Sequence, residues 1–201
     1  MTVASPKSPK KATSPPSRLG LAKDPANDEA KLSAPKASKS PAATPPPVGQ
    51  AVDSLKSQAD QGNSLAQYQL GFRYKTGLGV RKNLSLAQDY YLKAAKNGYD
   101  VAQFALAELL LKEESSFLDP TEASHWLKKA ADQGLAEAQY NLSLAYQLGV
   151  GVRKNLARAL EWLQKAAEND FTEAQRDLGL LLLAGGVVAK DVASGLSWLE
   201  K

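Results

Sequence analysis

Small and apolar residues recur along residues 62–201 with a constant period of 36 residues. The pair Ala-Gln begins at Ala66, Ala102, Ala138 and Ala174, and a leucine recurs at Leu70, Leu106, Leu142 and Leu178. Within one period the shared positions lie three or four residues apart, first over residues 66–74 and again over residues 87–95. This spacing places them on one face of a helix, so the pattern predicts two helices in every period and an all-α chain.

Glycine separates the two predicted helices, and a capping side chain begins the second. The segments Gly77-Leu78-Gly79-Val80 and Gly149-Val150-Gly151-Val152 occupy equivalent places, and glycine accepts the positive φ that a helix exit requires. The next column, which suits the N-cap of the second helix, contains Asn83, Asp119, Asn155 and Asp191. We therefore predict four units, at 62–97, 98–133, 134–169 and 170–201, after a capping helix at 51–61. Helix pairs of this size are stable only when stacked, which predicts an α-solenoid.

The composition changes near residue 49. Proline, serine, lysine and alanine dominate residues 1–49, whereas every aromatic residue lies after residue 67. A segment without aromatic side chains buries too little apolar surface to offset the entropy of ordering it, so residues 1–49 are predicted to be a disordered tail. The tail carries eight basic and three acidic residues, and residues 50–201 carry 17 basic and 18 acidic ones. The net charge of +4 therefore comes from the tail.

Several kinds of chemistry are not supported by the sequence. Without cysteine the chain has no disulfide, thiolate metal ligand or cysteine nucleophile. His125 is the single histidine and lies in a polar column, so we expect no metal, no cofactor and no enzymatic activity. The longest nearly apolar run, at 178–189, is too short to span a membrane, and no apolar stretch follows the charged N-terminus. A cytoplasmic location is the default expectation.

Two long motifs identify a family. AQYQLGFRYKTGLGV at 66–80 recurs as AQYNLSLAYQLGVGV at 138–152, which is followed by Trp162 and Lys165-Ala166-Ala167. These motifs resemble the Sel-one-like repeat family, which is related to tetratricopeptide repeats, over about residues 50–201. The resemblance implies a right-handed α-solenoid that acts as an adaptor. A further hypothesis, an enzyme that acts on cell-wall or lactam substrates, rests on family analogy alone. Glu113, Ser115 and Val187 depart from the loop pattern, so those two loops are expected to differ in shape.

The variable columns of the first helices are the candidate binding surface. If the recurring columns face the core, the variable ones face outward and line a concave groove for a protein or peptide segment. The candidate residues are Gln69, Phe72, Arg73, Glu108, Asn141, Leu144, Asp177 and Leu180. Phe72, Leu144 and Leu180 would anchor the partner, and the polar members would select it by hydrogen bonding and charge. The alternative interpretation is an ordinary solvated face.

Two further patterns have two interpretations each. Tyr68, Phe104 and Tyr140 form an aromatic column that either packs between repeats or stacks on a ligand. The basic pairs Arg81-Lys82 and Arg153-Lys154 lie in identical VRKNL segments and are either solvated loops or contacts for one acidic partner.

The two ends of the chain carry separate hypotheses. Ser5-Pro6-Lys7-Ser8-Pro9-Lys10-Lys11 resembles proline-directed phosphorylation sites and basic linker-histone elements. In the alternative function, the tail binds nucleic acid or an anionic surface and the repeats are only a carrier. At the other end, Leu180–Leu183 and Trp198-Leu199 are followed by no polar capping helix. We expect an apolar edge there, open to self-association or to further repeats.

Overall fold

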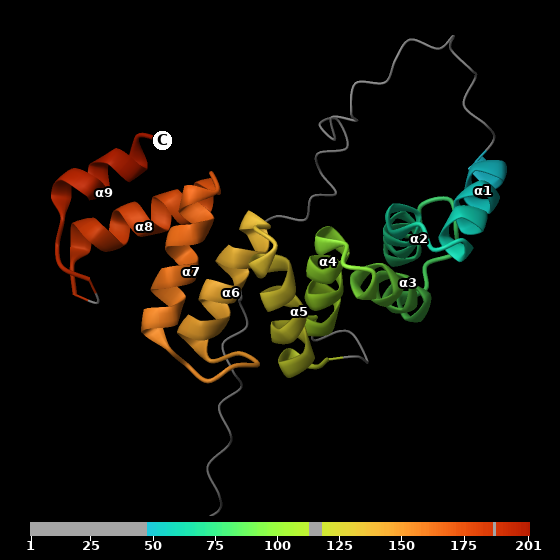
Figure 1. Cartoon of the computed structure of the whole chain (residues 1–201), viewed down its shortest axis with the longest axis horizontal. Coiled ribbons are helices and arrows are strands. Elements are labelled where there is room, and N and C mark those ends of the chain that lie inside the picture. Colours follow the sequence, from blue (N-terminus) through green and yellow to red (C-terminus); the bar gives the residue numbers. More distant parts are fainter. Residues whose placement is uncertain (1–47, 113–117, 187) are drawn as a thin grey trace, which may run out of the picture. The chain divides into compact units, whose positions relative to one another are not determined.

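Stacked helix pairs make up the part of the chain that the structure describes. The computed structural model describes residues 48–112, 118–186 and 188–201, and all regular secondary structure in these ranges is α-helical. The helices are α1 (Val48–Asp60), α2 (Ser64–Thr76), α3 (Leu84–Lys96), α4 (Asp100–Leu111), α5 (Pro120–Asp132), α6 (Ala136–Leu148), α7 (Leu156–Glu168), α8 (Thr172–Ala184) and α9 (Val192–Leu199). Each helix packs against the one before it and the one after it, in chain order (Figure 1). The predicted solenoid of helix pairs is confirmed.

The first helix begins earlier than the sequence predicts. Helix α1 starts at Val48, whereas the sequence analysis places the end of the tail at residue 49 and the capping helix at 51–61. The prolines of the tail end at residue 47, so none lies inside α1, where it would remove a helical hydrogen bond. Val52, Leu55 and Ala59 of α1 pack in one cluster with Leu70 and Tyr90 of the first pair. The predicted tail up to residue 47 and the atypical loop residues Glu113, Ser115 and Val187 lie outside the described residues.

The helix boundaries follow from the predicted capping residues. All four predicted capping side chains accept a hydrogen bond from a backbone N–H of the following turn: Asn83, Asp119, Asn155 and Asp191. Helices α2 and α6 end at Gly77 and Gly149, where φ is 86° and 80°. Replacing an N-cap side chain by alanine typically costs about 1 kcal/mol of stability. Local chemistry therefore sets where each second helix begins.

The recurring glutamine joins neighbouring helices through its buried side chain. The Nε2 atoms of Gln67, Gln103, Gln139 and Gln175 donate to the carbonyl oxygens of Ala59, Ala95, Ala131 and Ala167 at 3.0 to 3.2 Å. The Oε1 of Gln67 accepts a hydrogen bond from Asn97 at 3.2 Å, and that of Gln139 accepts one from Asn169 at 2.8 Å. Because both ends of the amide are paired, the glutamine is buried without an unpaired polar atom. In the first three repeats the glutamine therefore links the first helix to the helix before it and to the C-cap residue of the second helix after it.

The alanine and aromatic columns form the interfaces between helices. Ala87, Ala94 and Ala95 and their equivalents are buried, which lets the helices approach closely. At Gly71 of α2 a Cβ would lie 2.5 Å from a ring carbon of Tyr91, so only glycine fits this contact. In each repeat a lysine lies over the aromatic ring of the residue three positions earlier. The Nζ atoms of Lys93, Lys129, Lys165 and Lys201 lie 3.8 to 5.1 Å from the ring centroids of Tyr90, Trp126, Trp162 and Trp198. This cation–π contact accounts for the recurrence of lysine after the aromatic column.

Among the helices in the described ranges, none has both the length and the hydropathy needed to cross a membrane.

Candidate functional site: a groove between the last two repeats

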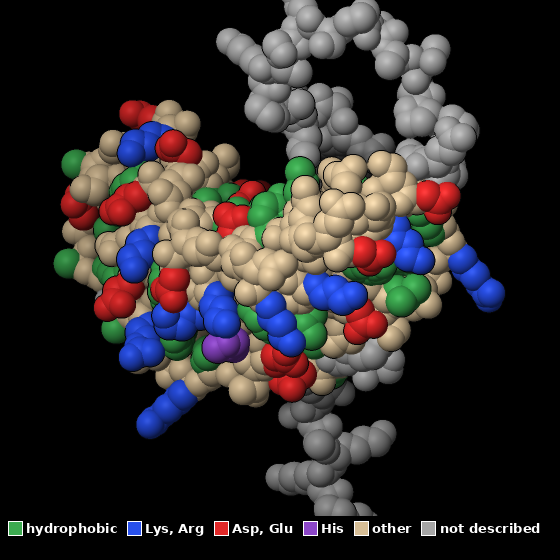
Figure 2. Space-filling view, turned by 45° about the vertical axis from the view of Figure 1, so that its right-hand side comes forward, with side chains coloured by type: hydrophobic (Ala, Val, Ile, Leu, Met, Phe, Trp, Pro, Cys, Tyr) green, Lys and Arg blue, Asp and Glu red, His purple; other side chains and the backbone are tan. Residues whose placement is uncertain are grey.

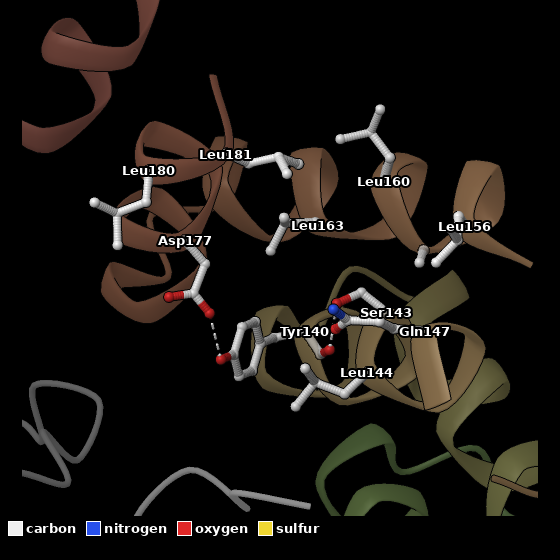
Figure 3. Close-up of a pocket in the computed structure, with 11 residues that line it drawn as sticks. Tyr140, Ser143, Leu144, Gln147, Leu156, Leu160, Leu163, Asp177, Leu180 and Leu181 are labelled. Carbon is white, nitrogen blue, oxygen red and sulfur yellow. Dashed lines mark hydrogen bonds between the residues drawn. The ribbon is translucent and has the colours of Figure 1, made fainter. Parts of the chain in front are cut away.

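A leucine-rich groove lies between α6, α7 and α8, and we refer to it as the α6–α8 groove (Figure 3). Its volume is about 370 Å³. Its walls are Tyr140, Ser143, Leu144 and Gln147 of α6, Leu156, Ala159, Leu160 and Leu163 of α7, and Asp177, Leu180 and Leu181 of α8. Such a volume falls within the range typical of binding clefts in proteins.

The leucines of the groove come from regular positions on their helices. Leu156, Leu160 and Leu163 lie at positions i, i+4 and i+7 of α7, so they share one helix face. Leu180 of α8 is 52 % exposed and Leu156 of α7 is 42 % exposed. The groove therefore presents large apolar side chains that the chain itself leaves in contact with solvent.

A hydrogen-bonded pair forms the polar end of the groove. Tyr140 Oη donates to Asp177 Oδ2 at 2.8 Å, as the dashed line in Figure 3 marks. Burial of the ring, together with the hydrogen bond to Asp177, raises the pKa of Tyr140 from 10.0 to about 12. Arg176 binds the other oxygen of the same carboxylate, with Nε at 3.0 Å and Nη2 at 2.8 Å. The carboxylate is therefore held in one orientation beside an apolar surface.

The equivalent space is filled in the first two repeats. Tyr91 and Leu127 take the place of Leu163, and each of them is only 1 % exposed. Glu108 takes the place of Leu144, and its carboxylate pairs with Lys75 at 3.6 Å in a nearly buried ion pair. The open groove is thus a property of the third and fourth repeats.

Two of the predicted site residues do not face outward. Glu108 is 5 % exposed and Asn141 is fully buried, with Nδ2 donating to the Glu137 carbonyl at 3.0 Å. Their predicted place on an open groove is wrong. A variable column is not necessarily an exposed column, because the next repeat in the stack covers part of each first helix.

The remaining predicted residues fall into two groups. Leu144, Asp177 and Leu180 come together in the α6–α8 groove. The other three lie on α2, in the first repeat, and do not line the α6–α8 groove. Of these, Gln69 is exposed, Phe72 packs against the core, and Arg73 Nη1 donates to the Leu78 carbonyl at 3.5 Å.

The aromatic column packs between repeats. The Tyr68 ring lies 5.7 Å from that of Tyr91 and 5.6 Å from that of Tyr99, and Phe104 is buried. Tyr140 packs on Phe171, the residue before α8, with ring centroids 5.1 Å apart. These contacts favour the packing interpretation over a ligand-stacking ladder. The four basic loop residues, Arg81, Lys82, Arg153 and Lys154, are exposed.

The residues that α7 contributes to the groove, Leu156, Leu160 and Leu163, were not among the sequence-based candidates, which came only from the first helix of each pair. The spacing i, i+4 and i+7 is the ordinary spacing of a buried helix face, so it does not by itself distinguish these leucines from core residues. Ser143, Gln147 and Leu181 were missed for a different reason, since they lie beside the recurring core positions of their helices.

The last helix leaves apolar side chains in solvent. Leu196 and Leu199 of α9 are 50 % and 40 % exposed, whereas Trp198 is half-buried beneath Lys201. In the described ranges, no group of three His, Cys, Asp or Glu side chains is placed to hold a metal ion.

Helix pairs stacked in chain order define an α-solenoid repeat protein. The chain belongs to the Sel1 repeat family, whose model matches residues 64–99, 100–135, 136–171 and 172–201. The matched repeats begin two residues after the units predicted from the sequence. Proteins of this family are generally protein-interaction adaptors.

Solved structures and a curated relative agree with this assignment. A Sel1 repeat protein from Oxalobacter formigenes is 36% identical with a TM-score of 0.68, over 74% of this chain and 61% of that one. The antigen c5321 of uropathogenic Escherichia coli is 34% identical with a TM-score of 0.69, over 73% of this chain and 32% of that one. The chitin synthase regulator SKT5 of Malassezia restricta is 33% identical over 51% of this chain and 7% of its own length. The chain thus corresponds to a small part of this curated relative.

Proposed function

We propose that the chain is a non-enzymatic adaptor that binds an apolar segment of another protein in the α6–α8 groove. The observation that carries the proposal is the exposure of Leu156 of α7 and Leu180 of α8, which both line one groove. Full burial of a leucine side chain is worth about 1.5 to 3 kcal/mol relative to exposure. A partner segment that covers both side chains gains about half of this free energy at each of them, because Leu180 is 52 % exposed and Leu156 is 42 % exposed.

The polar end of the groove favours one orientation of the bound segment. The Asp177 carboxylate is fixed by Tyr140 and Arg176, so a partner N–H placed there meets an acceptor that needs no reorientation. A segment with one apolar anchor and one donor group fits both features. An amphipathic helix laid in the groove is the general mode of recognition that presents such a pair.

The family assignment supports the same conclusion. Sel1 repeat proteins are generally adaptors, and the matched relative SKT5 is named as a regulator of chitin synthase. Nothing in that name identifies the partner of this chain, so the proposal concerns the site and the chemistry of the bound segment.

Capture of partners by the full chain tests the proposal. Leu180→Asp places a charge in the groove, and Leu78→Asp is a matched control because Leu78 in the α2–α3 loop is also 52 % exposed. We expect Leu180→Asp to weaken the affinity for a captured protein by about tenfold or more, since 1.4 kcal/mol corresponds to tenfold. Leu78→Asp should leave that affinity unchanged.

A second groove variant separates binding from folding. Leu156→Asp adds a negative charge at the start of α7, where the helix dipole tolerates it, and should also weaken the affinity. If both groove variants keep their circular dichroism and still bind as tightly as the control, the groove is not the binding site.

A further inference from the structure

A second hollow lies where α7 begins, and we refer to it as the Arg158 pocket. It is lined by Tyr146, Val152, Arg153, Lys154, Asn155 and Arg158, and its volume is about 540 Å³. Three of these six residues carry a positive charge and none carries a negative one. The pocket does not share a lining residue with the α6–α8 groove.

The loop that carries these charges is held firmly on the preceding repeat. Ser124 Oγ of α5 donates to the Val150 carbonyl at 2.9 Å, and the Asn155 N–H donates to the Tyr146 carbonyl at 2.8 Å. Gly151 has a φ of 67°, and a Cβ at this position would collide with the Pro120 carbonyl oxygen. Arg153 and Lys154 therefore project from a loop whose backbone is fixed at both ends.

Arg158 is positioned by its own contacts. Its Nη1 donates to Tyr146 Oη at 3.3 Å, and its guanidinium carbon lies 5.7 Å from the centre of the same ring. Its backbone N–H donates to the Asn155 side chain at 3.1 Å. A guanidinium held in this way loses little conformational entropy when it binds an anion.

The positive charges of the pocket lack acidic partners within the described ranges. The ion pairs found there join Lys75 to Glu108, Lys128 to Asp132 and Arg176 to Asp177, and none involves a residue of the pocket. The N-terminal end of α7, which begins at Leu156 beside the pocket, adds a partial positive charge. The electrostatic complement of the pocket is an anion.

The first repeat provides an internal comparison. Its loop has the same Arg81-Lys82-Asn83 sequence, and Tyr74 occupies the place of Tyr146. Leu86, however, replaces Arg158, and Tyr74 instead stacks on Tyr90 with the ring centroids 5.7 Å apart. The third positive charge and its tyrosine support are thus special to the third repeat.

We propose that the Arg158 pocket binds a carboxylate side chain of an acidic segment in a protein partner. Two arginines present planar forks of donors that match a carboxylate, and Lys154 adds a third positive charge. Nucleic acid fits less well, because its phosphates require an extended basic surface. Residues 50–201 carry 17 basic and 18 acidic residues, and Figure 2 shows both kinds interspersed over the visible face. The Arg158 pocket is separate from the α6–α8 groove, so an experiment can exclude binding at one site without excluding it at the other.

Titration of the ¹⁵N-labelled full chain with a hexaglutamate peptide, followed by NMR, tests this assignment. We expect the largest amide shift changes at residues 152–158, which also distinguishes the pocket from contacts with the basic tail. Arg158→Leu copies the first repeat and should weaken the affinity measured at these amides by about fivefold, the size expected for one charge-assisted contact. Arg158→Lys retains the charge without the planar fork of donors, so its affinity should lie between those of the original chain and Arg158→Leu.

Arg81→Ser in the first loop is the matched control and should change that affinity less than about twofold, because exposed charges contribute little. The assignment is overturned if residues 152–158 do not shift, or if Arg81→Ser weakens binding as much as Arg158→Leu. Tighter binding of a uridine hexanucleotide than of hexaglutamate at the same amides would overturn the choice of a protein carboxylate as the occupant.

Discussion

The hydroxyl of Tyr140 donates to Asp177 at 2.8 Å, and one repeat earlier the same two columns contain Phe104 and Asn141. Phe104 has no hydroxyl to donate. Within the described ranges, Asn141 Oδ1 is a buried side-chain atom that has no hydrogen-bond partner. A contact made between the third and fourth repeats is therefore incomplete between the second and third.

Restoring the missing hydroxyl should stabilise the protein. In Phe104→Tyr, the new hydroxyl is placed to donate to Asn141 Oδ1, and a hydrogen bond of this kind contributes about 1 kcal/mol. Urea unfolding should show a midpoint above that of the original chain with an unchanged slope. The gain should vanish when Asn141 is also replaced by leucine, and a gain that persists there would show a different cause.

Among the described residues other than glycine, Asp170 has a positive φ, of 60°. The equivalent positions of the preceding repeats are Gly98 and Gly134, with φ of 86° and 95°. Because glycine adopts this conformation without a Cβ clash, we expect Asp170→Gly to raise the free energy of unfolding by about 0.5 to 1 kcal/mol. Gln175 would lose a 3.4 Å contact with Asp170 but would retain its bond to Ala167.

The reciprocal change is the control for this prediction. Gly134→Asp introduces the same side chain at a φ of 95°, where no neighbouring atom lies within 4 Å of the added Cβ. Thermal unfolding should show a lower melting temperature for Gly134→Asp and a higher one for Asp170→Gly. Equal shifts in the same direction would contradict a backbone origin.

The stability of the chain should fall at high pH as Tyr140 ionises. Burial and the hydrogen bond to Asp177 raise the pKa of Tyr140 to about 12 in the folded chain, above the ordinary tyrosine value of 10.0. The unfolded chain therefore releases this proton first, so the contribution is complete below pH 10 and is lost between pH 10 and about 12. Tyrosinate absorbance during titration should show a late step that Tyr140→Phe removes. A late step that persists in this variant would assign it to another tyrosine.

The architecture could be predicted because each repeat carries its own local signals. The N-cap column of Asn83 and its equivalents and the glycine exits act within a few residues of where they occur, and the buried Ala-Gln pairs join helices that follow one another in the chain. The start of α1 was less predictable, since its first three residues, Val48, Gly49 and Gln50, carry no such signal.

The binding surface was predicted less completely, because exposure depends on the neighbouring repeats. Leu144, Asp177 and Leu180 line the α6–α8 groove, and their role in partner binding stays a prediction. Glu108 belongs to the same column as Leu180, yet one is 5 % exposed and the other 52 %. A period of 36 residues gives both residues the same place in the repeat. Their exposed fractions differ only because the next helix pair packs differently over each of them.

Site-specific photo-crosslinking tests most directly whether the α6–α8 groove holds a protein segment. A benzophenone side chain placed at position 180 of the full chain should crosslink to one defined segment of a captured protein, and the same group at position 78 should not, although both positions are 52 % exposed. The crosslinked segment should contain a large apolar residue at the point of attachment. Identical crosslinks from positions 180 and 78, or crosslinks from position 78 alone, would contradict the account.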